Sequence, residues 1–385
     1  MIVKYGIILL IFLFSFTGLK AQDFYAKSHT LNKVFADLVN AYGSAKTAPK
    51  LELLPDNKTD KIIAQYYAIP TPTIKVDEML FDLCMSMGAD SLNALSIILS
   101  HELAHYYNDH NWCGDFSFAI RNTTLGKQII SETKDYYISH EKEADNFGLY
   151  HSCIAGYKPF NIYNKLINKI YSSYNLPENL KGYPSKSERI LIGKDAQEKI
   201  ARLYTEFNTG VTAINNGSYD TAINYFDDLN KYFPSRENYN NLAVAKTLNA
   251  LKLKPLQRKE FKFPFEVDYI SRLNANNNRS IDEEAAEKMD TLLRSAKNDF
   301  EKAISLDPKY TKAYINLACV YILLENYDAS LGVLNSLNGS SDTIIMLKAI
   351  AYYRNDNDKK LHEMLVLWQK TDSNFYKSNF LLLKE

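Results

Sequence analysis

The sequence is poor in the residues and charges that mark several large classes of protein. Only 14 glycines and 11 prolines occur in 385 residues, which is too few for a loop-rich or disordered chain. Neither charge is in excess, because 45 lysines and arginines balance 45 aspartates and glutamates. A neutral chain has no overall field that attracts nucleic acid or an anionic membrane. We therefore expect a helix-rich globular protein without nucleic acid as a partner.

Several short motifs are also missing. No C-x-x-C pair occurs, so neither a thiol redox motif nor a zinc knuckle is indicated. Three of the four cysteines fall in the first predicted domain, which allows at most one disulfide there: Cys84, Cys113 and Cys153, with Cys319 beyond it. No glycine-rich phosphate loop and no G-x-S-x-G motif is present. The sequence therefore indicates neither phosphate-loop nor serine-hydrolase chemistry.

The chain also lacks an apolar run as long as an ordinary membrane-spanning helix, which needs roughly 20 such residues. A shorter run at residues 5–19 follows Lys4 and precedes the small residue Ala21. This pattern predicts a secretory signal, residues 1–21, cleaved before Gln22, and an uncleaved N-terminal anchor is the alternative. The mature chain would then carry no transmembrane segment. We expect it in the periplasm of a Gram-negative bacterium first, and secreted second.

What is present begins with an H-E-x-x-H pattern inside the stretch SLNALSIILSHELAHYYNDH. Apolar residues recur there at helical spacing, so the stretch predicts a largely buried helix. His101 and His105 then project from one face and can share one zinc ion, with Glu102 beside them. The alternative is a pair of buried helical histidines that have found polar partners.

A catalytic zinc site takes three protein ligands, so a third must come from a later element. The stretch SHEKEADNFGLYHSCIAG, residues 139–156, predicts another helix on which Glu141 and Asp145 share one face. Glu141 would bind the zinc. Asp145 would accept the N–H of a ligating histidine and so fix its tautomer.

Other interpretations of this stretch stay open. His140 and His151 compete as the third ligand, although neither shares the face of the two carboxylates. The charged run EKE alone is typical of a solvated helix surface. Small residues at Ala144 and Gly148 favour a packed face instead, because they let a second helix approach closely.

The two stretches together resemble the zinc metallopeptidase family that includes HtpX and the CAAX prenyl-protein endopeptidases. That family combines H-E-x-x-H with a glutamate ligand in E-x-x-x-D and a later proline and arginine, here Pro184 and Arg189. The resemblance covers roughly residues 74–192. It implies one zinc ion per chain, together with its ligands and a catalytic base: His101, His105, Glu141 and Glu102.

Two departures from the family accompany this match. Many relatives carry a histidine before the proline, where this chain has Tyr183, so Tyr183 must replace that histidine or its function is absent. Relatives that cleave prenylated or membrane proteins span the membrane several times, whereas this chain has no such segments. The resemblance therefore implies a soluble, exported version, with Tyr183 and Arg189 as supporting residues.

A candidate substrate strand precedes the zinc-site helix. Residues 70–80 read PTPTIKVDEML, in which Thr73–Val76 predict a short strand that the prolines keep at a sheet edge. Zincins often bind substrate backbone along such an edge by strand addition. An ordinary strand without this role is the alternative.

Beyond about residue 200 a helix-turn-helix pattern of 34 residues takes over. Small and large residues recur at the spacing of a tetratricopeptide repeat, for example Gly210, Ala222 and Phe226. The stretches that fit helices of such repeats are residues 210–234, 239–251, 296–308, 313–337 and, as a degenerate last repeat, 343–365. We expect three to four stacked repeats that present a groove to peptides or partner helices.

Residues 254–282 interrupt these repeats and contain KEFKFPFEVDYI and NANNNRS. Such insertions often lie on a binding face, and a mobile loop is the alternative. A metallopeptidase domain followed by repeats resembles the exported, BepA-like bacterial enzymes. That resemblance implies quality control of misfolded or unassembled envelope proteins, with outer-membrane assembly components as partners of the repeat groove.

These observations predict a mainly α protein. An α+β zincin domain with a small sheet, residues 22–195, would precede an all-α repeat domain, residues 200–385. The predicted function is a zinc-dependent endopeptidase of protein or peptide substrates, in which Glu102 takes a proton from water. The alternative is a chaperone-like or scaffold protein that acts through the repeat groove, with a latent or structural zinc. An intact Glu102 favours the enzyme, because a purely structural site has no use for a base.

Overall fold

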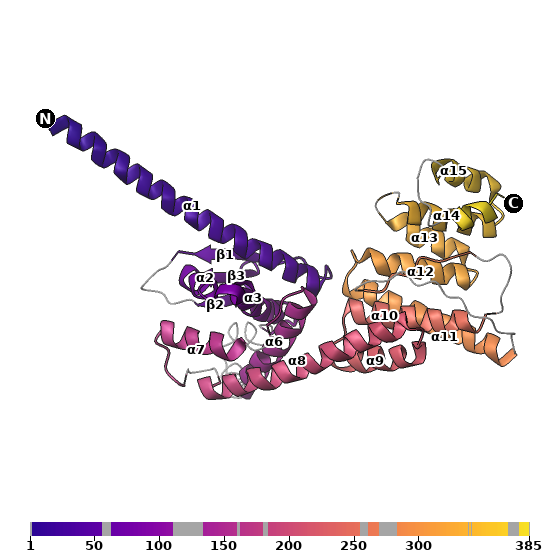
Figure 1. Ribbon diagram of the computed structural model, residues 1–385, viewed down its shortest axis with the longest axis horizontal. Helices are drawn as coiled ribbons and strands as arrows, with labels where there is room; N and C mark the ends of the chain where they lie inside the picture. Colours follow the sequence, from indigo (N-terminus) through magenta and orange to yellow (C-terminus); the bar gives the residue numbers. More distant parts are fainter. Residues whose placement is uncertain are drawn as a thin grey trace, which may run out of the picture. The chain divides into compact units, whose positions relative to one another are not determined.

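The chain divides into two compact units in a computed structural model (Figure 1). The first comprises Met1–Tyr42 and Lys46–Arg202, and the second comprises Gly43–Ala45 and Leu203–Glu385. The structure describes residues 2–55, 63–110, 134–159, 162–179, 184–254, 261–268, 283–337, 339, 341–368 and 377–384. Side chains are described from Gln22 onward, apart from residues 134–138 and 283–284.

The first unit combines helices with one small sheet. Its elements are α1 (Ile2–Tyr42), β1 (Lys50–Leu54), β2 (Ala64–Tyr67), β3 (Thr73–Asp77), α2 (Glu78–Met85), the 3-10 helix η1 (Gly88–Asp90), α3 (Ser91–Tyr107), α6 (Lys134–Ile154), α7 (Tyr163–Ser173) and the first part of α8 (Lys186–Asn215). The mainly α fold with a small three-stranded sheet is therefore confirmed. Cleavage after Ala21, which stays a prediction, would shorten α1 so that it begins at Gln22.

The strand expected at a sheet edge lies in the middle of the sheet, so that prediction is wrong. The strand order is β1-β3-β2, with β1 parallel and β2 antiparallel to β3. Pro72 precedes β3 instead of interrupting it, and its carbonyl accepts the Lys50 N–H at 2.8 Å. Ile74 and Val76, on one face of β3, are fully buried. Since both edges of β3 are paired, strand addition to this sheet is possible only at β1 or β2.

Helix α3 runs through the core of the first unit. It packs against α1, α2, α6, α7 and β2. Its apolar residues recur at helical spacing and are almost fully buried: Leu95, Leu99 and Leu103. Tyr42, at the end of α1, donates its hydroxyl hydrogen to the Ser100 carbonyl at 2.9 Å and stacks on His151. The H-E-x-x-H pattern therefore lies on a helix that is held from several sides.

The second unit is built of helix pairs. After the end of α8 it contains α9 (Tyr219–Tyr232), α10 (Arg236–Lys252), α11 (Glu283–Leu306), α12 (Thr311–Leu323), α13 (Tyr327–Ser336), α14 (Asp342–Arg354), α15 (Asp358–Trp368) and α16 (Lys377–Leu382). Each helix from α9 to α15 packs on the next, and α10 also packs on α12 and α12 on α14. Alternate helices therefore lie in one layer, as in a stacked helical repeat.

Small residues let these helices touch, as the repeat pattern predicts. A Cβ atom at Gly210 would lie 2.9 Å from the ring of Phe226, and Ala222 beside it is fully buried. Part of the predicted insertion also contradicts the mobile-loop alternative, because residues 261–268 are bound to the repeat helices through several hydrogen bonds. The remainder of the insertion lies outside the described residues.

None of the helices in the described part of the chain is both long and apolar enough to cross a membrane. The cysteines Cys84, Cys153 and Cys319 are buried free thiols. Cys113 lies outside the described residues.

Candidate metal centre

The two histidines of the H-E-x-x-H pattern meet Glu141 across the contact between α3 and α6. His101 Nε2 and His105 Nε2 are 3.1 Å apart. Glu141 Oε2 lies 3.3 Å from His101 Nε2, and Glu141 Oε1 lies 3.5 Å from His105 Nε2. All three donor atoms lie within 4.8 Å of one another, and the side chains are buried or nearly so. The structure thus brings together the residues predicted as zinc ligands.

Asp145 lies on the far side of His101 and holds its ring in place. Its Oδ1 atom is 2.9 Å from His101 Nδ1, and its Oδ2 atom accepts a hydrogen bond from the Tyr163 hydroxyl at 2.8 Å. With Nδ1 directed at this carboxylate, Nε2 is the ring nitrogen of His101 that faces the other donors. Asp145 has the position predicted for it, whereas nothing in the sequence pattern indicated Tyr163.

Close contact between α3 and α6 depends on Gly148. A Cβ atom at this position would lie 2.9 Å from the His101 backbone nitrogen, closer than real Cβ atoms approach. Ala144, one turn earlier, is fully buried. The small residues therefore let α6 lie directly against the segment of α3 that carries the histidines, as predicted.

Glu102 points toward the sheet. Its Oε2 atom accepts the backbone N–H of Tyr66 on β2 at 2.8 Å. In the β2–β3 register Tyr66 lies opposite Ile74, and its N–H faces away from β3. The outer edge of β2 and the carboxylate of Glu102 are therefore neighbours, a contact that the sequence pattern did not indicate.

Arg189, on α8, contacts the proposed ligand Glu141. Its Nη2 atom lies 3.5 Å from Glu141 Oε2. Burial by itself would lower the pKa of the Arg189 guanidinium, but Tyr163, Asp145 and Glu141 outweigh burial and raise it. Arg189 is therefore a permanent cation behind the carboxylates, which agrees with the supporting position predicted for it.

The carboxylates create a demand for positive charge at the donor atoms. Burial by itself would lower the pKa of His101, but hydrogen bonds and charge from Asp145 and Glu141 outweigh burial and raise it to about 10. Burial alone would raise the pKa of Glu141, but its hydrogen bonds to His101 and His105 and the charge of Arg189 hold it well below the usual value. Both effects report an excess of buried negative charge that a cation would balance.

A third histidine contacts the site without having been expected there. His110 Nδ1 lies 2.9 Å from His105 Nδ1, and the His110 ring stacks on His140 at a centroid distance of 4.2 Å. Burial and the neighbouring His105 and His140 lower the pKa of His110 to about 3. A neutral His110 can accept the Nδ1–H of His105 and thereby direct the His105 Nε2 lone pair at the donor cluster.

The donor set fits a divalent zinc ion. Two imidazole nitrogens and a carboxylate are ligands that zinc commonly takes. Two Nε2 atoms that face each other at 3.1 Å need a proton or a cation between them. Glu141 Oε2 is buried and makes no hydrogen bond of good geometry. The zinc ion itself stays a prediction.

Other predicted residues do not join the cluster. His151 stacks between Tyr42 and Phe147 and directs Nδ1 at the Phe147 carbonyl, so it is not among the converging donors. His140 stacks on His110 and is not one of the three converging donors. Tyr183, proposed as a supporting residue, lies outside the described residues.

Comparisons with known proteins bear on the second unit. The family model of the tetratricopeptide repeat matches residues 300–345, from the end of α11 to the start of α14. No peptidase family model matches, and no curated protein matches the chain. The chain therefore contains at least one tetratricopeptide repeat, a module that binds protein partners.

A search of solved structures finds weak similarity to a second protein. A monomeric mutant of IFIT1 with Gppp-AAAA is 14% identical to this chain and has a TM-score of 0.35. The alignment covers 77% of this chain and 73% of the IFIT1 chain.

Proposed function

We propose that the first unit is a zinc-dependent endopeptidase. The proposal depends on one observation: His101, His105 and Glu141 converge from two helices, with Asp145 behind His101 and Glu102 next to His101 in the sequence. When bound, zinc would act as a Lewis acid that polarises a carbonyl and lowers the pKa of water. A purely structural site would need the donors but not the adjacent carboxylate.

The residues around the donor cluster have separate proposed roles. Asp145 orients His101, and Arg189 balances the charge of Glu141. Glu102 is the proposed general base, which takes a proton from the attacking water and returns it to the leaving amine. In the free protein its carboxylate accepts the Tyr66 N–H, so it is held at the outer edge of β2 before substrate arrives.

The outer edge of β2 is the proposed position for the substrate backbone. It takes over the role that the sequence suggested for β3, which is paired on both sides. The Tyr66 N–H lies on the outer edge of β2 and donates to Glu102. An extended peptide added along this edge would therefore pass Glu102. We propose unfolded or unassembled envelope proteins as substrates, in the periplasm of a Gram-negative bacterium, in accordance with the predicted signal.

The test compares Glu102→Gln with the parent chain, both starting at Gln22 and loaded with zinc. Glutamine keeps an oxygen that can accept the Tyr66 N–H, so the fold and the zinc content should be preserved. Cleavage of an unfolded polypeptide should fall by at least about 100-fold, because general-base catalysis contributes that much or more. Zinc content is measured in parallel by elemental analysis.

A matched control is Glu52→Gln, since Glu52 lies on β1 of the same unit and its side chain is 48% exposed. It should cleave like the parent. Cleavage by Glu102→Gln at the parent rate would refute the base assignment. A parent chain that binds no zinc would refute the site itself.

The comparisons support a second role better than they support the first. The match to a tetratricopeptide repeat and the paired helices α10–α15 support protein binding by the second unit. This role includes a chaperone-like adaptor or scaffold, with outer-membrane assembly components as proposed partners. Cells that depend on the protein separate the two roles: a scaffold tolerates Glu102→Gln, whereas a peptidase does not.

A further inference from the structure

A short piece of the insertion lies along the repeat helices as an extended peptide. This docked segment, Phe261–Asp268, reads FKFPFEVD. It is held by residues of α10, α12 and α16, and Phe261 at its start contacts Tyr353 and Arg354 of α14. The segment belongs to none of these helices, because it lies in the connection between α10 and α11.

Asparagine side chains grip the main chain of the docked segment. Asn316 accepts the Glu266 N–H and donates to the Glu266 carbonyl, both at 2.9 Å. Asn379 does the same for Lys262, at 2.9 Å and 2.8 Å. A side-chain amide offers one donor and one acceptor, which match the N–H and C=O of an extended residue. This pairing recognises a backbone and does not depend on the side chains of the peptide.

Two further asparagines on α10 complete the row. Asn240 donates to the Glu266 carbonyl at 2.9 Å, and Asn241 accepts the Asp268 N–H at 2.8 Å. All four asparagines are buried, with Asn240, Asn241, Asn316 and Asn379 each 0% exposed. Burying an amide without a partner costs free energy. The row is therefore suited to the backbone of an extended chain.

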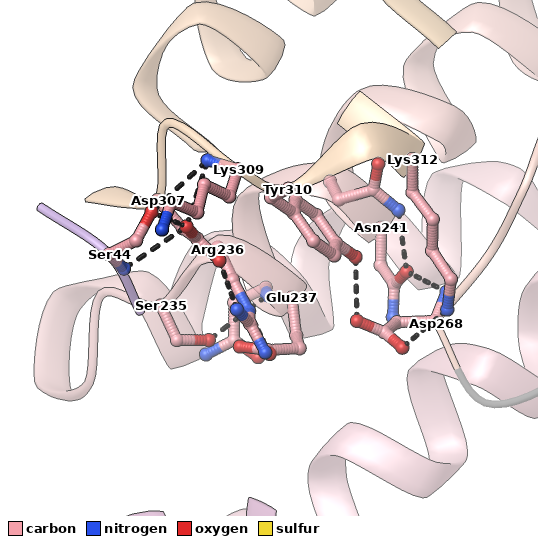
Figure 2. A network of polar contacts seen from close by, with 12 residues as sticks. Ser44, Ser235, Arg236, Glu237, Asn241, Asp268, Asp307, Lys309, Tyr310 and Lys312 are labelled. Atoms are coloured by element: carbon pink, nitrogen blue, oxygen red, sulfur yellow. Dashed lines mark hydrogen bonds and ion pairs between the residues drawn. The ribbon is translucent and has the colours of Figure 1, made fainter. Parts of the chain in front are cut away.

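Side chains of the docked segment supply the specific contacts. Phe265 and Val267 are 2% and 4% exposed, whereas Lys262 points to solvent. At the end of the segment, Asp268 accepts hydrogen bonds from the Tyr310 hydroxyl at 2.6 Å and from Lys312 Nζ at 2.9 Å (Figure 2). The surface thus selects an aromatic residue, an apolar residue and a carboxylate.

The contact between Tyr310 and the Asp268 carboxylate is supported by Arg236 and its ion pairs. The Arg236 guanidinium lies over the Tyr310 ring, 5.0 Å from its centroid, and is fixed by ion pairs with Glu237 and Asp307. Figure 2 shows the hydrogen bond from Ser44 to Asp307 and, beside it, the hydrogen bond from Tyr310 to Asp268. Tyr310 is therefore pre-oriented to donate to a carboxylate.

We propose that this surface is a binding site for an extended peptide of a partner protein, and that the docked segment is an internal occupant of it. The partner peptide has an aromatic residue, an apolar residue two positions later and a carboxylate next to that, as in Phe265, Val267 and Asp268. Partner binding then competes with the docked segment. The proposal extends the interaction role given above and does not depend on zinc or turnover.

The test measures binding of a fluorescently labelled peptide with the sequence of residues 261–268. The release variant is the full chain with Phe265→Asp and Val267→Asp. These substitutions would bury two carboxylates in apolar contacts and so release the docked segment. This variant should bind the peptide at least about tenfold more tightly than the parent does. Adding Asn316→Ala should weaken binding by about tenfold, since two backbone hydrogen bonds are lost.

Lys262→Ala is the matched control, because the Lys262 side chain is exposed and its loss leaves the docked segment in place. It should bind the peptide as weakly as the parent. A folded release variant that binds no more peptide than the parent overturns the proposal. Dimers of the release variant in light scattering, with no peptide binding, would assign the surface to a second copy and overturn it too.

If the release variant does not fold, hydrogen exchange on the parent tests whether the docked segment can leave its site. The amides of Glu266 and Asp268 should exchange well before those of α10 and α12, because an exchangeable occupant leaves without unfolding the repeats. Exchange together with the helices would make the docked segment a fixed part of the core and overturn the proposal. A partner that still binds Asn316→Ala normally would retain the interaction role while excluding this surface.

Discussion

The two units bury polar side chains in opposite arrangements. In the first, His101, His105 and Glu141 converge on one point from α3 and α6. In the second, buried asparagines form a row across α10, α12 and α16. A point of convergent donors fits an ion, whereas a row of amides fits a chain. The geometry of buried polar groups therefore distinguishes two kinds of ligand within one polypeptide.

The two arrangements also differ in whether their buried polar groups have hydrogen-bond partners. In the row of asparagines, the side-chain amides of Asn316 and Asn379 each donate one hydrogen bond to the docked segment and accept one from it. In the donor cluster, Glu141 Oε2 has no hydrogen bond of good geometry, and it lies near nitrogen atoms of His101 and Arg189. We expect the stability of the first unit to depend strongly on an added cation. The second unit has an occupant of its own.

Breaking the close contact behind the donor cluster should have the largest effect. Gly148→Ala places a Cβ atom 2.9 Å from the His101 backbone nitrogen, which must move with its helix. We expect the free energy of unfolding to fall by about 1–3 kcal/mol, as for other overpacked cores, and zinc binding to weaken. Gly332→Ala is the control, because no atom lies within 4 Å of its Cβ and alanine favours a helix. Equal stability of the two variants in denaturant titrations would contradict the structure.

Removing the carboxylate behind His101 should have the next largest effect. Asp145→Asn keeps the shape of the side chain but weakens its hold on His101 Nδ1–H and its hydrogen bond with Tyr163. Loss of such a supporting contact typically costs about 10–100-fold in metal affinity. Competition with a chromophoric chelator measures the affinity. Asp37→Asn, at an exposed contact of α1, should bind zinc like the parent, and an unchanged Asp145→Asn would exclude the orienting role.

Thiol labelling can separate the two units in one experiment. Burial raises the pKa of Cys84 and Cys153 to about 12 and that of Cys319 well above its usual value, so labelling at pH 8 requires opening of the fold. Zinc at about 100 times its Kd should slow labelling of Cys84 and Cys153 by up to about 100-fold. Cys319, in the second unit, should be labelled at its original rate.

This labelling is best done with Cys113→Ser, so that only three thiols are followed by mass spectrometry. Equal slowing of all three would mean that the units unfold together. No slowing at Cys84 and Cys153 would mean that the first unit binds no zinc.

The smallest effect concerns acid stability of the second unit. Burial opposes ionisation of Asp307, but hydrogen bonds from Ser44 and Lys309 and the charge of Arg236 outweigh it and lower the pKa of Asp307. Its contribution to stability is present above the unfolded pKa near 4 and is lost as the pH falls through the lower folded value. Asp307→Asn should therefore make the free energy of unfolding of the second unit, measured by urea titration, less dependent on pH in this range. A pH profile identical to the parent's would exclude the contribution.

Residues linked by helical spacing could be predicted from the sequence. His101 and His105 are one turn apart, as are Glu141 and Asp145, so each pair had to share a face. Small residues at Ala144 and Gly148 indicated that the second face was packed. The tetratricopeptide spacing likewise identified Gly210 and Phe226 as repeat positions, and the structure places Gly210 against the Phe226 ring.

Contacts between distant residues without a periodic pattern were not predictable. The position of β3 depends on β1 and β2, whose short sequences give little sign of a strand. Tyr66 approaches Glu102 through its backbone, which no side-chain pattern reports. The grip of Asn316 on Glu266 likewise joins residues 50 positions apart, and asparagines within a repeat helix look like any other polar residues.

The inclusion of Gly43–Ala45 in the second unit has a consequence for how the protein is made. Ser44 and its partner Asp307 are 263 residues apart. At about 5–20 residues per second, a ribosome needs roughly 13–53 s to travel from one to the other. During that time α3, α6 and α8 are synthesised, so all residues of the candidate metal site precede Asp307 along the chain. A chain truncated before Asp307 would therefore keep every residue of the candidate metal site and lose the contact that ties Ser44 to the second unit.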